Sequence, residues 1–258
     1  MRHYRGRFWM LGVLGLWFCA LNAGAVDVLE STPVGSWQQR EESTIDHKGR
    51  EAVALVRSSM IAKEERNGQP HYWIEVESQN YKVKNGKRKK DGDITIVKVL
   101  VSQAALTGDP GDIMSNLRGI GDEIILQSGD QQPMRITGGG AMADAMLQAM
   151  GTQMDYDYRT AGEKDVSVPA GTFTCTVHEG SGYTEMKVMF KTIRVESETQ
   201  MCLSGSVPFA LVSSESESVT NGDKSKTTVK LLEFGASGAV SKITQAPADA
   251  PSLPSFLN

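Results

Sequence analysis

The sequence predicts a mainly β protein: a curved antiparallel sheet, or incomplete barrel, with one or two short helices plugging its concave face. Three observations support this prediction. Apolar and polar residues alternate with a period of two along most of the chain. Asn-Gly, Gly and Pro turns separate the alternating stretches. Only two stretches do not fit a strand, and both have small or apolar residues at helical spacing.

The first predicted strands form a hairpin. Residues 52–65 and 71–84 alternate on either side of Asn67-Gly68, a dipeptide typical of two-residue hairpin turns. Residues 93–106 follow as a strand rich in β-branched side chains. Two shorter strands are predicted, in "DEIILQSG" and "QPMRIT".

Four further segments have the length and composition of strands, at residues 165–180, 183–197, 208–218 and 226–235. The total is roughly nine or ten strands. A flat sheet of that width would curl. Helices must then cover the concave face, because its apolar side chains would otherwise be exposed to water.

The two exceptions are the helix candidates. Residues 109–121 offer Asp109 as a cap and Pro110 at the first helical position. Residues 138–154 combine several alanines with a methionine every four residues, and Gly151 is a plausible stop. Because side chains four apart lie on one slanting stripe, we expect a cavity or lid surface there. Its residues are Met142, Met146, Leu147, Met150 and Met154.

The methionine row has three interpretations. Methionine fills irregular gaps, so the row is first of all plain core packing. It also suits an adaptable lid over an apolar cavity, with Gly138 to Gly140 as a hinge. The third interpretation is Cu(I) binding by thioethers, although no His or Cys lies nearby in sequence.

The N-terminus predicts export. Arg2, Arg5 and Arg7 precede the apolar run at residues 8–21, and "AGA" follows at Ala23 to Ala25. We expect a cleaved signal peptide at residues 1–25 and a periplasmic protein. One domain should span residues 26–245, followed by a disordered, Pro-rich tail at 246–258.

Charge and cysteines narrow the class further. Losing the three arginines of the leader changes the formal charge from −4 to −7, which argues against nucleic acid as a partner. Cys175 and Cys202 then remain as an even pair, which predicts a disulfide in an oxidising compartment. Two separate buried thiols are the alternative.

One local stretch reverses the acidic balance. Six basic residues surround Asn85-Gly86, and they form either a solvated hairpin loop or a contact for anionic headgroups or an acidic partner. A peripheral membrane contact is therefore one expectation. The residues are Lys82, Lys84, Lys87, Arg88, Lys89 and Lys90.

The sequence offers no catalytic constellation. "HEGSGY" lacks the G-x-S-x-G pattern of a nucleophile elbow, and the histidines show no ligand spacing. Paired acids such as Glu41-Glu42 point to opposite faces of a strand. We therefore expect no enzyme, no cofactor and no metal.

Six motifs in fixed order carry a family resemblance: "VGSWQQRE", "NGQPHYWIEVE", "IVKVLV", "DVSVPAGTFTCTV", "VPFALVSSES" and "LLEFGASGAVSKI". In this order the chain resembles a group of uncharacterised periplasmic proteins that look like members of the LolA/LolB superfamily of lipoprotein-carrier half-barrels. The resemblance spans about Val34 to Ile243. It implies a curved sheet, a hydrophobic cavity, helices acting as a lid, and no catalysis. No functional residue of the family is carried over to this chain.

The expected function is that of a non-enzymatic periplasmic carrier or chaperone. Its ligand would be a lipid, a lipidated molecule or another hydrophobic cargo, bound in the half-barrel cavity. The alternative is an accessory subunit that docks a protein partner in a cell-envelope complex.

Overall fold

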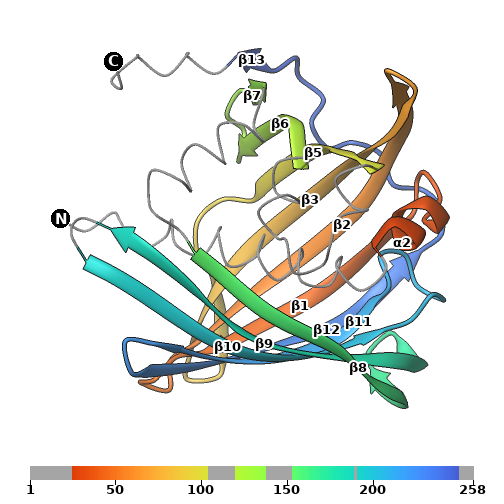
Figure 1. The fold of residues 1–258 in the computed structure, drawn as a ribbon. Helices are drawn as coiled ribbons and strands as arrows, with labels where there is room; N and C mark the ends of the chain where they lie inside the picture. Colours follow the sequence, from red (N-terminus) through yellow and green to blue (C-terminus); the bar gives the residue numbers. More distant parts are fainter. Residues whose placement is uncertain (1–24, 104–119, 138–152, 189–190, 250–258) are drawn as a thin grey trace.

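The computed structural model describes residues 25–103, 120–137, 153–188 and 191–249. These residues form one helix and a single 13-stranded sheet that is open and strongly curved (Figure 1). The predicted fold class, mainly β with an open sheet and a short helix, is confirmed. The helix is α2 (Ala25–Ser31). The strands are β1 (Trp37–Ile45), β2 (Glu51–Arg66), β3 (Gln69–Lys84), β4 (Lys87–Lys90), β5 (Thr95–Ser102), β6 (Ile120–Ser128), β7 (Met134–Thr137), β8 (Gln153–Val168), β9 (Gly171–Val188), β10 (Lys191–Leu203), β11 (Leu211–Thr220), β12 (Asp223–Gly235) and β13 (Ala248–Asp249).

The sheet consists of two antiparallel meanders. One meander contains β1, β2, β3, β5, β6 and β7, and the other contains β8 to β12. They join where β1 pairs with β12, so strands from the two ends of the chain meet in the middle of the sheet. Strand β4 extends the edge of β3 as a short hairpin, and β13 adds to β7 in parallel.

Three Asn-Gly turns fix the register of three hairpins. Asn67-Gly68, Asn85-Gly86 and Asn221-Gly222 all have positive φ at both residues, which is the conformation that a two-residue hairpin turn requires. The first two turns are the ones that the sequence predicted. Since register decides which side chains face the hollow, these turns also fix the composition of the concave face.

Several strand boundaries differ from the prediction. Residues 165–180 contain the turn between β8 and β9, whose strands run for 16 and 18 residues. Strands β1 and β8 were not predicted, because their alternate positions are polar on both faces and give little hydrophobic signal.

The predicted disordered tail is wrong at its start. Ala248 and Asp249 form β13 beside Met134 and Arg135 of β7, and the Ala248 N–H donates to the carbonyl of Pro133 at 2.8 Å. An open edge with unpaired backbone groups binds an extended segment even when that segment is rich in Pro. Residues 250–258 lie outside the described part of the chain.

The predicted helices lie almost entirely outside the described residues. Residues 109–119 and 138–152 are not described; Ile120 and Gly121 belong to β6, and Gln153 and Met154 begin β8. The helix that the structure shows over the concave side is α2, at the start of the expected mature chain (Figure 1). The proposed leader lies outside the described residues, apart from Ala25.

Candidate functional site on the concave face

An apolar row crosses five strands of the first meander. Residues directly opposite each other in an antiparallel pair share a face, so the register defines each row without further assumption. The row is Met60, Ile74, Val99, Ile124 and Ile136, on β2, β3, β5, β6 and β7 respectively. A second row beside it continues from Val76 through Val97 and Leu126 to Met134.

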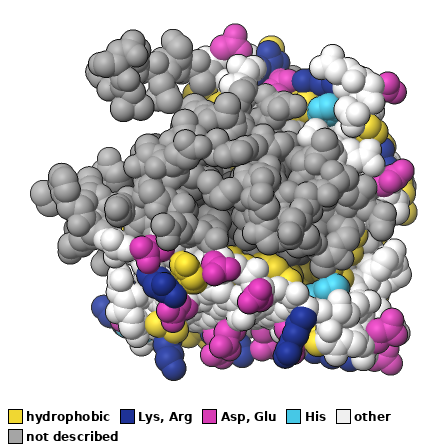
Figure 2. Space-filling view, in the orientation of Figure 1, with side chains coloured by type: hydrophobic (Ala, Val, Ile, Leu, Met, Phe, Trp, Pro, Cys, Tyr) yellow, Lys and Arg dark blue, Asp and Glu magenta, His cyan; other side chains and the backbone are white. Residues whose placement is uncertain are grey.

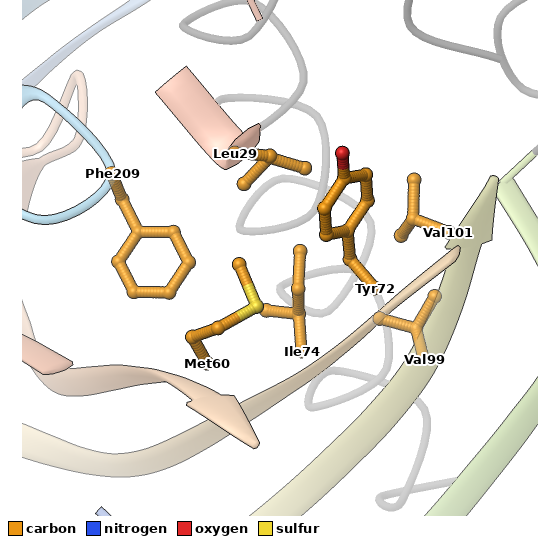
Figure 3. Packing of buried hydrophobic residues seen from close by; sticks show 7 residues of the cluster. All are labelled: Leu29, Met60, Tyr72, Ile74, Val99, Val101 and Phe209. Carbon is orange, nitrogen blue, oxygen red and sulfur yellow. The ribbon is translucent and has the colours of Figure 1, made fainter. Parts of the chain in front are cut away.

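Two short elements among the described residues, α2 and the loop between β10 and β11, cover the central part of the first apolar row. Leu29 of α2 and Phe209 of the loop between β10 and β11 pack on Met60, Ile74 and the strand residues around them (Figure 3). The complete cluster is Leu29, Met60, Tyr72, Ile74, Val99, Val101 and Phe209, with Val76 packed against it. Met60 and Ile74 of the first row are fully buried, whereas Met134, at the β7 end of the second row, is 40% exposed.

The loop that carries Phe209 is conformationally strained. Phe209 and Ala210 have φ of 61° and 58°, the left-handed region that bulky side chains rarely occupy. Such a residue costs on the order of 1–3 kcal/mol and persists only where its surroundings hold it. Here the N–H of Phe209 donates to Thr32 Oγ1, just beyond α2, at 3.4 Å. The loop and the helix therefore form one connected cover.

The second meander presents hydroxyls to the same hollow. Val229 and Met201 pack with Val28 of α2, which places this face of β12 and β10 on the side of the helix. Two residues away on the same face of these strands, side-chain hydroxyls form hydrogen bonds. Thr44 and Thr227 are hydrogen-bonded at 2.9 Å, and Thr199 donates to Ser216 at 2.9 Å. The row of opposed residues is Thr44, Thr227, Ser216, Thr199, Gly180 and Tyr158.

A buried ion pair marks the boundary between the two meanders. Arg40 of β1 is 1% exposed, and its Nε donates to Glu42 Oε1 at 2.9 Å while Nη1 donates to Ser58 Oγ at 3.0 Å. Arg40 lies opposite Val56 and Leu231, and Glu42 lies opposite Val229. A charge pair in such surroundings is strongly desolvated. Removing either partner alone would therefore lower the free energy of unfolding substantially.

The other face of the second meander is charged and furrowed. Alternate residues such as Glu215 and Glu217 are exposed there, while their neighbours Ser214 and Ser216 are buried on the opposite face. Two open furrows of about 670 and 750 Å³ lie along it, and Arg159 pairs with Glu179 inside the first (2.8 Å). Figure 2 shows acidic and basic side chains interspersed on the lower part of the molecule, where β8 lies in front in Figure 1. The first furrow is lined mostly by polar and charged residues, whereas the second also contains Ile45, Tyr183 and Val219.

The predicted site residues have mixed outcomes. Met142, Met146, Leu147 and Met150 lie outside the described residues, and Met154 is the second residue of β8, opposite Thr184. The lid interpretation of the methionine row therefore stays a prediction. The six basic residues of the 82–90 stretch lie on β3 and β4, and all are exposed.

The predicted disulfide is absent: Cys175 and Cys202 are both buried free thiols in one cluster. Cys202 lies opposite Val177, so the two cysteines are diagonal neighbours across β9 and β10. Diagonal positions typically separate Cα atoms by about 7–8 Å, beyond the range that a disulfide spans without backbone movement. Burial, followed by a side-chain hydrogen bond with Cys202, raises the pKa of Cys175 to about 12.

Neither the cover nor the boundary was predicted from the sequence. No pattern singled out Leu29, and Phe209 fell within the strand predicted at residues 208–218. The signal for the ion pair was available: in "WQQREESTI" Arg40 and Glu42 are two residues apart, and therefore on one face of a strand. Only the fold shows that this face is the buried one.

Two features are absent from the described residues, 25–103, 120–137, 153–188 and 191–249. Within these ranges no group of three His, Cys, Asp or Glu residues is arranged to hold a metal ion. Nor does the described part of the chain contain a helix long and apolar enough to cross a membrane. What the geometry does provide is a concave face with an apolar half, a hydroxyl-bearing half and, among the described residues, a short cover of Leu29 and Phe209.

Fold and site together define a class: an open, curved antiparallel sheet with a covered apolar hollow. Comparisons with known proteins add little to this. No family model matches the chain, and no curated protein matches it. A Bacteroides fragilis protein described as exported, with a YmcC-like fold, is similar at 11% identity and a TM-score of 0.38, over 79% of this chain and 97% of that one. A Parabacteroides distasonis protein described as a lipoprotein is similar at 12% identity and a TM-score of 0.38, over 79% and 96%. Likeness at this level supports no functional argument.

Proposed function

We propose that this protein is a non-enzymatic, exported carrier or chaperone of the periplasm that binds lipid, lipidated or other hydrophobic cargo on the concave face. The observation that carries the proposal is the continuous apolar row from Met60 to Ile136: Met60 and Ile74 at one end are fully buried beneath Leu29 and Phe209, and Ile124 and Ile136 at the other end are only partly buried.

The cover suits reversible binding. Helix α2 is only seven residues long, and the N–H of Phe209, a residue with positive φ, donates to Thr32 Oγ1 just beyond that helix. Lifting the cover would expose the apolar cluster while releasing that strain. A ligand that fills the hollow would replace the contacts of Leu29 and Phe209.

The division of the hollow suits an amphiphilic cargo. An acyl chain fits the apolar rows of the first meander, where each buried methylene contributes about 0.8 kcal/mol. The hydroxyl groups of Ser216, Thr199 and their neighbours could satisfy the polar part of the same molecule.

Probe binding tests the proposal. We would replace Ile124 and Ile136 together by Gln, and measure binding of the apolar fluorophore N-phenylnaphthylamine by fluorescence. The matched control replaces Val34 and Val240, which are 50% and 71% exposed, by Gln. Burying one such side chain contributes roughly 1.5–3 kcal/mol, so we expect the site variant to lose at least about tenfold in affinity and the control to bind like wild type.

Equal binding by wild type, site variant and control would contradict the proposal. Native mass spectrometry of protein purified from the periplasm supplies a second readout, since co-purifying phospholipid or fatty acid would support the carrier. A stoichiometric protein partner with no lipid would support the docking-subunit alternative instead.

A further inference from the structure

Three turns lie together at one end of the sheet. They connect β1 to β2 (residues 46–50), β3 to β4 (85–86) and β11 to β12 (221–222), and they are adjacent at the lower left of Figure 1. The register places them there: Ile45 lies opposite both Glu51 and Lys226, and Ala52 lies opposite Lys82. We call residues 46–50, 82–90 and 221–224 the basic end.

The basic end has a large excess of positive charge in an acidic chain. It contains nine Lys and Arg residues and two Asp residues, whereas the whole chain has a formal charge of −4. Three of the nine are in ion pairs: Arg50 with Asp46, Lys82 with Asp91 and Arg88 with Glu41. The other six are exposed lysines without an ion-pair partner among the described residues: Lys48, Lys84, Lys87, Lys89, Lys90 and Lys224.

The hairpin places like charges directly opposite each other. Lys84 lies opposite Lys87, and Lys82 opposite Lys89, in the β3–β4 pairing. Directly opposed like charges destabilise a strand pair. A negatively charged partner would relieve this repulsion between the lysines. A hairpin that contacts only water gains nothing that offsets it.

The hairpin is also held in a fixed orientation. Both terminal nitrogens of Arg88 donate to the carboxylate of Glu41 on β1, at 2.7 and 2.9 Å. Arg88 is therefore a positioning residue, while Lys84, Lys87 and Lys89 lie on the opposite face of the hairpin and have no ion-pair partner among the described residues.

We propose that the basic end binds the anionic headgroups of a lipid bilayer. Its charges are flexible lysine ammonium groups spread over three protruding turns, which fits a laterally mobile, flat array of phosphates better than one paired carboxylate site. Ile45, 47% exposed, lies at the base of the turns and adds an apolar contact at the same surface. This inference goes beyond cargo binding, because it concerns where the protein docks and not what the hollow holds.

Vesicle co-sedimentation tests this inference on the mature chain. We would compare phosphatidylcholine vesicles with vesicles that also contain phosphatidylglycerol. The test variant replaces Lys84, Lys87, Lys89 and Lys90 by Gln, and the charge-matched control replaces Arg159, Lys164, Lys230 and Lys242, which are exposed elsewhere. Each basic group near an anionic surface changes affinity by about fivefold, so the test variant should lose at least about tenfold and the control much less.

Binding by wild type should require phosphatidylglycerol and should weaken with salt, because exposed charges are screened. The proposal is overturned if wild type binds the two vesicle types equally, or if the test variant and the control lose affinity to the same extent. Glu41→Gln, which frees the hairpin without removing a lysine, should weaken vesicle binding less than the quadruple change. N-phenylnaphthylamine binding should be unchanged in the quadruple variant, so failure of membrane docking and failure of cargo binding are distinguishable.

Discussion

The two meanders have the same antiparallel architecture, but the side chains on their concave faces differ. In the first, the residues that face the hollow are Met, Ile and Val, and they pack beneath α2 and Phe209. In the second, the corresponding rows contain Thr, Ser and Tyr whose hydroxyls bond to one another across the strands. Both rows are at least partly buried, but the first gains from removing apolar area from water and the second from satisfying polar groups.

This difference teaches that curvature alone does not make a uniform pocket. Under the proposed carrier function, a uniformly apolar face would accept any apolar cargo, whereas a divided face would orient an amphiphilic one. The Arg40–Glu42 pair lies at the division, on the strand that joins the meanders. The comparison can be tested by removing one group at a time from each half and from the boundary.

The largest effect is expected at the boundary. Glu42→Ala leaves the guanidinium of Arg40, 1% exposed, without its carboxylate, which should cost about 3–5 kcal/mol of unfolding free energy. Urea denaturation followed by circular dichroism measures this loss. The double change of Arg40→Met with Glu42→Leu removes both charges and should recover most of the stability. A single variant as stable as wild type would show that water reaches this pair.

The next effect separates the two halves directly. Ile74→Ala removes a fully buried side chain from the apolar row and should cost about 2–5 kcal/mol. Ser216→Ala removes one hydroxyl bond from the polar row and should cost about 0.5–1.5 kcal/mol. Denaturant midpoints of the two variants, measured side by side, provide the check. Similar losses would mean that the halves do not differ energetically as their composition indicates.

How much of this could be predicted from the sequence depends on the meander. In the first meander β-branched alternation and Asn67-Gly68 give strands and register, so the β2–β3 hairpin and β5 were predicted nearly to their ends. In the second, β8 alternates Tyr with Asp and Arg, and such a pattern has little hydrophobic periodicity. The charges on this edge strand discourage pairing with other chains, which is a constraint on the folded surface and not on local conformation.

The candidate site was harder to predict than the fold. Its cover depends on contacts between Leu29, Phe209 and strands far from them in sequence, and no local pattern encodes such contacts. The same holds for Arg40, whose burial follows from the side of the sheet on which it lies. By contrast, the basic stretch around Asn85 was recognisable at once, because charge clustering within a hairpin is a local property.

A smaller effect is expected at the free edge of the polar meander. Tyr156 and Tyr158 lie opposite Gly182 and Gly180, and their stacked rings cover the bare backbone of these glycines. A Cβ at Gly182 would overlap the carbonyl oxygen of Asp155 and the ring of Tyr156, so Gly182→Ala should cost about 1–3 kcal/mol. Gly205→Ala is the control, since nothing lies within 4 Å of a Cβ there. Equal melting temperatures for the two variants would mean that this edge shifts freely.

The smallest effect concerns the thiol pair of the same meander. Because burial raises the pKa of Cys175 to about 12, the folded protein disfavours the thiolate that the unfolded chain forms above its ordinary pKa. The folded state then holds more protons in this interval, so stability should be constant up to about pH 9 and fall as the pH rises toward 12. Replacing Cys175 by Ala should flatten that alkaline slope. With a chromogenic thiol reagent near neutral pH, residues 26–258 in the native state should react slowly at both cysteines, and the same chain after denaturation should show two thiols. Finding no thiol after denaturation would establish a disulfide between Cys175 and Cys202. Strand β10 would then have to be shifted relative to β9, so that the two cysteines lie closer together than diagonal neighbours do.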